Sequence, residues 1–151
     1  MLTTHATVVI QQAYETIWST VVDMHNYWRW NPVLVDVRLP HGVLFQAPIQ
    51  AKYRVFAGVD SKKGYIEEVL APTQLAFCFV HIHPKWRTER WQLVLTPLSA
   101  HSTQVDLSIQ YTGWNSVSAW QKHIVGLNVA CELYLQALKQ QLERLPHEQI
   151  N

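Results

Sequence analysis

Three residues in the second half of this chain, His81, Glu89 and Tyr111, carry side chains that suit acid–base chemistry. A carboxylate beside an imidazole can hold the ring in one tautomer and increase its basicity, which suits proton transfer to a bound carbonyl compound. A tyrosine hydroxyl can donate a hydrogen bond to an enolate that develops during the transfer. This chemistry requires the three side chains to meet, which depends on how their strands pair.

The apolar pattern predicts strands near 74–82, 87–96 and 103–112, because apolar residues recur there at every second position. Two hairpins follow if apolar faces are matched: Leu75, Phe77 and Phe79 oppose Leu95, Leu93 and Trp91, which in turn oppose Val105, Leu107 and Ile109. A shift of one residue would place Arg90 on the apolar face. In the preferred register His81 opposes Glu89 and Tyr111 lies beside Glu89, at the point where the apolar face ends.

Other interpretations of these polar residues remain open. A structural polar rim is the simpler one, because polar groups at the edge of a buried face usually pair with one another. His81 and His83 have the spacing of two metal ligands on one strand face, but no cysteine pair or His-x-x-x-His sequence adds to them, so we expect no metal. The chain has 5 glycines and no glycine-rich loop for phosphates, so we expect no cofactor.

The segment before these strands combines a helical pattern, an aromatic corner and a proline. Apolar residues at helical spacing predict a helix near 13–22 and a short helical turn at 24–29. Asn31-Pro32 ends the helical region, because proline lacks an N–H and disfavours helical backbone at the residue before it. Further strands are expected near 4–11, 33–39, 49–57 and 63–70, with Lys62-Lys63 in a solvated turn.

A long C-terminal helix is expected at 115–145, bounded by Gly113 and Pro146. Its apolar stripe has steps of three or four residues: Trp120, Ile124, Leu127, Cys131, Leu135, Leu138, Leu142 and Leu145. Gly126 lowers local helix propensity by about 1 kcal/mol, which permits a bend but not a break.

The order of these elements, with Asp23, Tyr27 and Trp30-Asn31-Pro32 at the corner, resembles the START-like (SRPBCC) superfamily, nearly end to end. That superfamily includes birch-pollen-allergen-like, polyketide cyclase/dehydrase and Hsp90-activator-like branches. The resemblance implies an α+β helix-grip fold, in which a curved antiparallel sheet of about seven strands wraps a long C-terminal helix. The resemblance also implies two short helices after the first strand and a cavity between the sheet and the long helix. The resemblance implies no particular reaction.

Composition fits one domain over residues 1–151, since the chain is 48% hydrophobic and no linker or repeat interrupts it. A net charge of +1 without a basic run gives no reason to expect a nucleic-acid partner. The N-terminus has no signal-peptide pattern and no apolar run spans a bilayer, so stable membrane insertion is not expected. Cys78 and Cys131 lie in apolar patterns and are expected to be buried, reduced thiols of a cytoplasmic protein, with a disulfide between them as the alternative.

We therefore expect a carrier or sensor that binds a hydrophobic or aromatic small molecule, lipid-like or polyketide-like, in the cavity. Aromatic walls with a few orienting polar groups suit such ligands. The expected lining residues are Trp28, Trp30, Phe77, Phe79, Trp91, Trp120, His123 and Leu127. The alternatives are a polyketide cyclase or dehydratase that uses His81, Glu89 and Tyr111, and a protein–protein adaptor of the Hsp90-activator-like kind. The sequence determines neither the ligand nor the oligomeric state.

Overall fold

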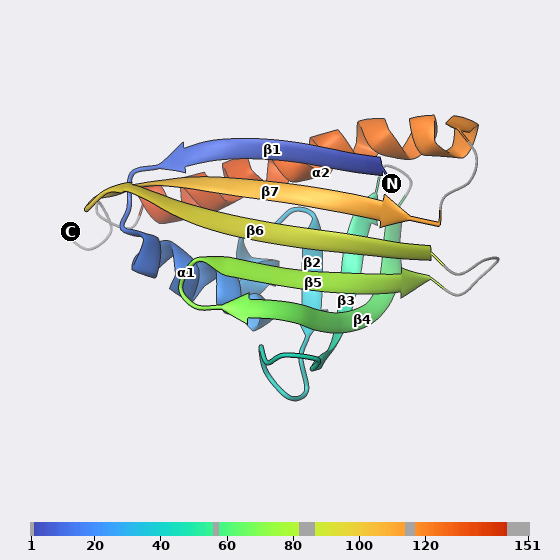
Figure 1. Ribbon diagram of the computed structural model, residues 1–151, viewed down its shortest axis with the longest axis horizontal. Coiled ribbons are helices and arrows are strands. Elements are labelled where there is room, and N and C mark those ends of the chain that lie inside the picture. Colours follow the sequence, from blue (N-terminus) through green and yellow to red (C-terminus); the bar gives the residue numbers. More distant parts are fainter. Residues whose placement is uncertain (1, 56–57, 82–86, 114–116, 145–151) are drawn as a thin grey trace.

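A computed structural model describes residues 2–55, 58–81, 87–113 and 117–144 of the chain, and the side chains of all of these except residues 2, 55 and 117–128 (Figure 1). The fold is the expected helix-grip arrangement: a seven-stranded antiparallel sheet, two short helical segments after the first strand, and a long helix near the C-terminus. In Figure 1 the long helix lies behind the sheet, along β1 and β7.

Most element bounds agree closely with the periodicity of the sequence, but β4 begins at Gly58, earlier than the strand expected near 63–70. The strands are β1 (Leu2–Ile10), β2 (Leu34–Arg38), β3 (Pro48–Val55), β4 (Gly58–Leu70), β5 (Gln74–His81), β6 (Arg87–Ser99) and β7 (Ser102–Thr112). The helical elements are α1 (Tyr14–Val22), the 3₁₀ segment η1 (Met24–Arg29) and α2 (Val117–Glu143). The helix α2 continues through Gly126 without a break, as expected.

The sheet order is β1-β7-β6-β5-β4-β3-β2, so every hairpin joins neighbours and β1 closes against β7. Figure 1 shows β2 and β3 running across the direction of β5, β6 and β7, so the sheet is strongly curved. The concave face is lined by the buried side chains at alternate positions of β6 and β7 and by Leu75, Phe77 and Phe79 of β5, a strand that is buried on both faces. The buried stripe of α2, from Cys131 to Leu142, belongs to the same core.

Of the two predicted hairpin registers, one is correct and the other is not. The β6–β7 register is confirmed, with Trp91 opposite Ile109 and Glu89 opposite Tyr111. The β5–β6 register was wrong by two residues, because Phe77 opposes Trp91 and Phe79 opposes Glu89. A shift of two keeps every side chain on its predicted face, so the burial pattern is unaffected.

Hydrogen bonds from side chains shape the corner between η1 and β2. The carbonyl Oδ1 of Asn31 accepts from the backbone N–H of Val33 at 2.9 Å and of Leu34 at 3.0 Å, which organises the turn around Pro32. The buried Tyr27 hydroxyl donates to the carbonyl of Val21 and lies 2.7 Å from the Tyr134 hydroxyl on α2. These contacts tie the helical corner to the long helix.

Candidate functional site

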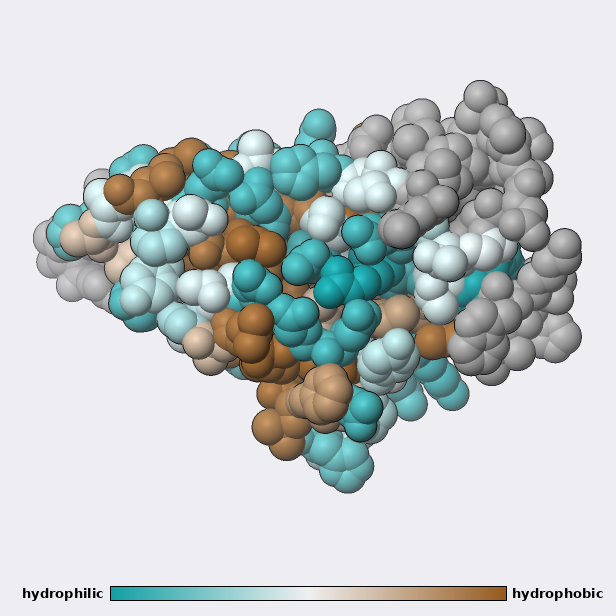
Figure 2. All heavy atoms as spheres, viewed as in Figure 1, coloured by the Kyte–Doolittle hydropathy of each residue, from teal (hydrophilic) through white to brown (hydrophobic). Residues whose placement is uncertain are grey.

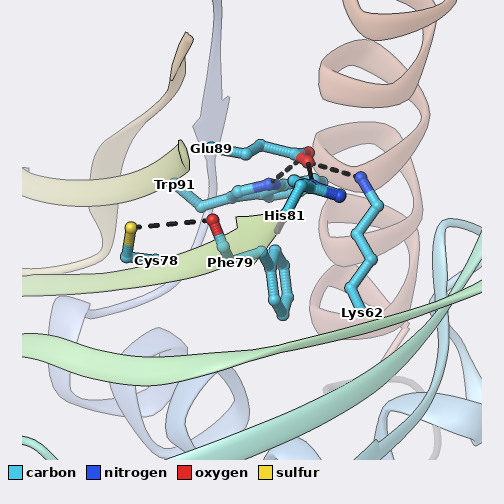
Figure 3. Close-up of polar contacts among 6 residues, drawn as sticks. All are labelled: Lys62, Cys78, Phe79, His81, Glu89 and Trp91. Atoms are coloured by element: carbon cyan, nitrogen blue, oxygen red, sulfur yellow. Dashed lines mark hydrogen bonds and ion pairs between the residues drawn. The ribbon is translucent and has the colours of Figure 1, made fainter. Parts of the chain in front are cut away.

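Glu89, on β6, is a carboxylate within the apolar concave face of the sheet. Its side chain is 1% exposed, and on its own strand it shares this face with Trp91. The indole Nε1 of Trp91 donates to Oε1 of Glu89 at 2.9 Å, while Oε2 accepts from two further residues (Figure 3). Burying a charge at such a position is costly unless opposite charge and hydrogen-bond donors surround it.

The countercharge is Lys62, from β4. Its Nζ lies 2.5 Å from Oε2 of Glu89, and its side chain is only 9% exposed. The ammonium also lies 4.1 Å from the centre of the Tyr53 ring and 5.9 Å from that of Phe79, within the range of cation–π attraction. The expectation of a solvated turn at Lys62 was wrong, because β4 begins at Gly58 and turns this residue toward the core.

His81 and Tyr111 complete the polar group. Nε2 of His81 lies 3.3 Å from Oε2 of Glu89, although the corrected register places His81 opposite Arg87, so the contact with Glu89 is diagonal. Tyr111 is directly opposite Glu89 on β7 and is buried. The three residues are thus brought together on the concave face, and Lys62 is the member that the sequence analysis missed.

The electrostatics fix the protonation states of two members. Burial alone would raise the pKa of Glu89, but the Lys62 charge and hydrogen bonds from His81, Lys62 and Trp91 outweigh it and lower the pKa to about 2. Burial, reinforced by the Glu89 charge, raises the pKa of Tyr111 well above its ordinary value. At neutral pH Glu89 is therefore a carboxylate and a weak base, and Tyr111 keeps its proton.

Aromatic rings surround the polar group. Phe77 stacks on Trp91 with ring centres 5.7 Å apart, and Phe79 meets both rings edge-on. From α2, Tyr134 lies 6.5 Å from Trp91 and 5.6 Å from Trp30, measured between ring centres. Of the lining residues expected from the sequence, Trp30, Phe77, Phe79 and Trp91 therefore belong to one aromatic cluster.

The remaining expected lining residues are Trp28, whose side chain is described, and three residues of α2, whose side chains are not. Trp28 was misplaced by the sequence analysis, because its side chain is 62% exposed and packs against the guanidinium of Arg29 at 5.0 Å. The backbone of Trp120, His123 and Leu127 lies within α2, but their side chains are outside the described part of the structure. The expected cavity, whose helix wall these three would form, therefore stays a prediction.

The structure also describes both cysteines and part of the residue set considered for a metal. Cys78 and Cys131 are free and buried, as expected. Burial raises the pKa of the Cys131 thiol to about 11, and its Sγ lies 3.5 Å from the hydroxyl of Thr4. Within the described residues no three His, Cys, Asp or Glu side chains gather as a metal site; His83 lies outside them. No described helix is long and apolar enough to cross a membrane.

Comparison with known proteins identifies the fold. The Zhui aromatase/cyclase from Streptomyces sp. R1128 superposes with a TM-score of 0.74 at 13% identity, over 95% of this chain and 94% of its own. A START superfamily protein from Mycobacterium smegmatis gives 0.70 at 21% identity, over 95% and 98%. The di-domain aromatase/cyclase StfQ of the steffimycin biosynthetic pathway gives 0.69 at 10% identity, over 95% of this chain and 46% of its own.

No protein-family model and no curated protein matches the sequence. The chain nevertheless shares the helix-grip fold of the Zhui aromatase/cyclase and of the START superfamily protein, and the likeness extends over nearly its whole length. At these identities the likeness concerns the fold alone, so the activity must be argued from the residues of this chain.

Proposed function

We propose that the protein binds a hydrophobic or aromatic small molecule between the concave face of the sheet and α2, as a carrier or sensor. The observation that carries the proposal is the Lys62–Glu89 ion pair with His81 and Tyr111, set among Phe77, Phe79 and Trp91. Ligand sites commonly combine apolar walls with a few convergent polar groups, and strongly perturbed pKa values concentrate at such sites. A core that served stability alone would gain little from a buried ion pair.

The polar group favours a ligand that carries a carbonyl or hydroxyl on an apolar frame. Tyr111 retains its proton and lies hydrogen-bonded beside Glu89, so a ligand oxygen placed next to this pair would meet a tyrosine hydroxyl donor and not a second carboxylate base. The structural likeness to aromatase/cyclases and to a START superfamily protein supports a ligand of this class.

The second candidate is a cyclase or dehydratase, and the His81–Glu89 contact favours it. In this mechanism the imidazole of His81 removes a proton beside a ligand carbonyl, since Glu89 is too weak a base to do so. Glu89 holds the ring and stabilises the imidazolium, and Tyr111 donates to the enolate oxygen. The proton then passes from His81 to the departing hydroxyl, which leaves as water.

Native mass spectrometry of freshly purified protein tests the binding proposal, followed by titration with a naphthalene-type probe monitored through Trp emission. We expect the mass of a co-purified ligand in the spectrum, or saturable binding of one probe molecule per chain. Where a ligand co-purifies, the probe should compete with it. Leu133→Ala, on the exposed side of α2, is the control and should bind normally. Absence of both signals in folded protein would refute the proposal and favour an adaptor role.

His81→Gln separates the carrier from the enzyme. A catalytic His81 predicts loss of turnover of a poly-β-keto substrate analogue with probe affinity kept within a few-fold, because the lost interaction would act in the transition state. A carrier predicts no turnover of this analogue by the wild type or by the variant.

A further inference from the structure

The connection between β2 and β3, residues 39–47, exposes two large apolar side chains. Leu44 is 62% exposed and Phe45 is 68% exposed. In Figure 2 hydrophobic colour gathers on the projection below the sheet, where Figure 1 places this connection. Two adjacent large apolar side chains that are exposed to this degree are available for contact with an apolar environment.

The connection is fixed to the sheet at both ends, so the exposure of its tip is built into the fold. Leu39 and Ala47 are buried in the core at its two ends. The backbone N–H of Gln46 donates to the carbonyl of Ile66 at 2.7 Å, and that of Ala47 to the carbonyl of Leu44 at 2.9 Å. Gln46 adopts a φ of 65°, which is uncommon outside glycine. The tip is thus held with its two apolar side chains outward.

Basic residues lie next to this connection, on the convex face of the sheet. Arg38 is the last residue of β2, and the register places Gln50 beside it and Lys63 beside Gln50. One step further from the connection, about 6.6 Å along the strands, the next outward row contains Asp36, Lys52 and Ser61. A hollow of about 260 Å³ is lined by Asp36, Arg38, Gln50, Ala51, Lys52, Ser61, Lys62 and Lys63.

The charge of this hollow is positive. Arg38, Lys52 and Lys63 contribute three outward cations, and Asp36, 3.9 Å from the Arg38 guanidinium, contributes one carboxylate. The ammonium of Lys62 faces the other side of the sheet and is neutralised by Glu89. The surface therefore presents an apolar tip and, next to it, a group of cations that line the hollow.

We propose that this surface, Leu44 and Phe45 with Arg38, Lys52 and Lys63, docks the protein reversibly on anionic phospholipid membranes. Apolar side chains that enter the boundary between headgroups and acyl chains, with cations at the level of the phosphates, match the order of groups found here. The hollow would receive one anionic headgroup. A protein partner fits less well, because two apolar side chains would bury far less surface than the roughly 800 Å² per partner of a stable interface.

Co-sedimentation with vesicles tests this proposal. Wild-type protein should bind phosphatidylcholine vesicles that contain 30% phosphatidylserine and should not bind pure phosphatidylcholine vesicles. Binding should fall at least fivefold when salt rises from about 50 to 500 mM, because surface charges are screened. Leu44→Ser/Phe45→Ser and Arg38→Gln/Lys63→Gln should each reduce binding at least fivefold. Leu98→Ser/Leu133→Ser, which removes two apolar side chains that are about half exposed elsewhere on the surface, should not.

Three results would overturn the proposal. The first is equal binding by the tip variant and the control variant, with urea unfolding showing that both are folded. The second is saturable binding of glycerophosphoserine in solution without binding to vesicles, which would assign the hollow to a soluble phosphate compound. Tip-dependent dimers in sedimentation analysis without vesicle binding would likewise replace the membrane with a second copy of the chain.

Discussion

At the scale of single residues, the main feature is a buried carboxylate that stays ionised. Both oxygens of Glu89 accept hydrogen bonds, among them those from Lys62, His81 and Trp91, and the interactions of the carboxylate outweigh the cost of burial. Continuum estimates and substitutions in other proteins show that such a pair seldom adds net stability, whereas removing one member is costly. The pair therefore holds the site in one arrangement, at little net gain in stability.

Glu89→Gln should destabilise the fold in a pH-dependent way. At pH 7 we expect a loss of about 3–5 kcal/mol, because Lys62 stays buried without its countercharge. The folded pKa of Glu89, about 2, lies below the unfolded value near 4.3, so its contribution is complete above about pH 5 and disappears as the pH falls toward 2.

Urea unfolding of wild type and variant at pH 7, 5 and 3 measures this effect. The difference between the two proteins should shrink as the pH falls. Glu67→Gln, which removes a half-exposed partner of Arg90, is the control and should cost less than about 1 kcal/mol. A difference that stays constant with pH would show that Glu89 is not ionised in the folded state.

Lys62 also shows where sequence reasoning about the site reached its limit. The acid–base residues were chosen by side-chain type and by their position on an apolar face, and the structure brings them together. A lysine pair in a polar stretch gives no such signal, since lysine is usually solvated. The one usable clue was the alternation of side chains along the strand, because it places Lys62 on the same face of β4 as Ile66, a core residue.

At the scale of elements, the sequence predicted the strands, their faces and the long helix, because periodicity and burial are coupled. It could not predict the β5–β6 register, since apolar residues at every second position match equally well after a shift of two. The length of the connection decides between such registers, and five residues separate His81 from Arg87. Trp28 was misplaced for a different reason. The residue types predict an aromatic corner, but they do not determine which of its rings points inward.

The contact between η1 and α2 gives an asymmetric prediction for two buried tyrosines. Tyr27 donates its only hydroxyl proton to Val21, so Tyr134 must donate to Tyr27. Tyr27→Phe leaves both the Val21 carbonyl and the Tyr134 hydroxyl unpaired and should cost about 2–3 kcal/mol. Tyr134→Phe leaves the bond to Val21 intact and should cost about 1 kcal/mol. Thermal or urea unfolding of the two variants provides the comparison; equal losses would contradict this donor order.

At the scale of the whole molecule, one curved sheet serves two environments. Its concave face, with α2, encloses the aromatic cluster and the Glu89 group, while its convex face at β2–β4 carries the proposed membrane contact. Alternation along a strand keeps the two apart, because successive side chains point to opposite faces. A carrier or sensor built in this way could contact a membrane without exposing its ligand.

The neighbouring residues Lys62 and Lys63 test this separation, because one faces each side of the sheet. Lys62→Met should destabilise the fold by about 3–5 kcal/mol, since it leaves Glu89 buried without its countercharge, and should leave vesicle binding unchanged. Lys63→Met should change stability by less than about 0.5 kcal/mol and should weaken binding to anionic vesicles. Urea unfolding gives the stabilities of the two variants. Co-sedimentation under conditions in which both variants are folded gives their binding to anionic vesicles. In the double variant the two effects should add, because sites on opposite faces share no partner. Loss of vesicle binding in folded Lys62→Met would show instead that the two faces are coupled.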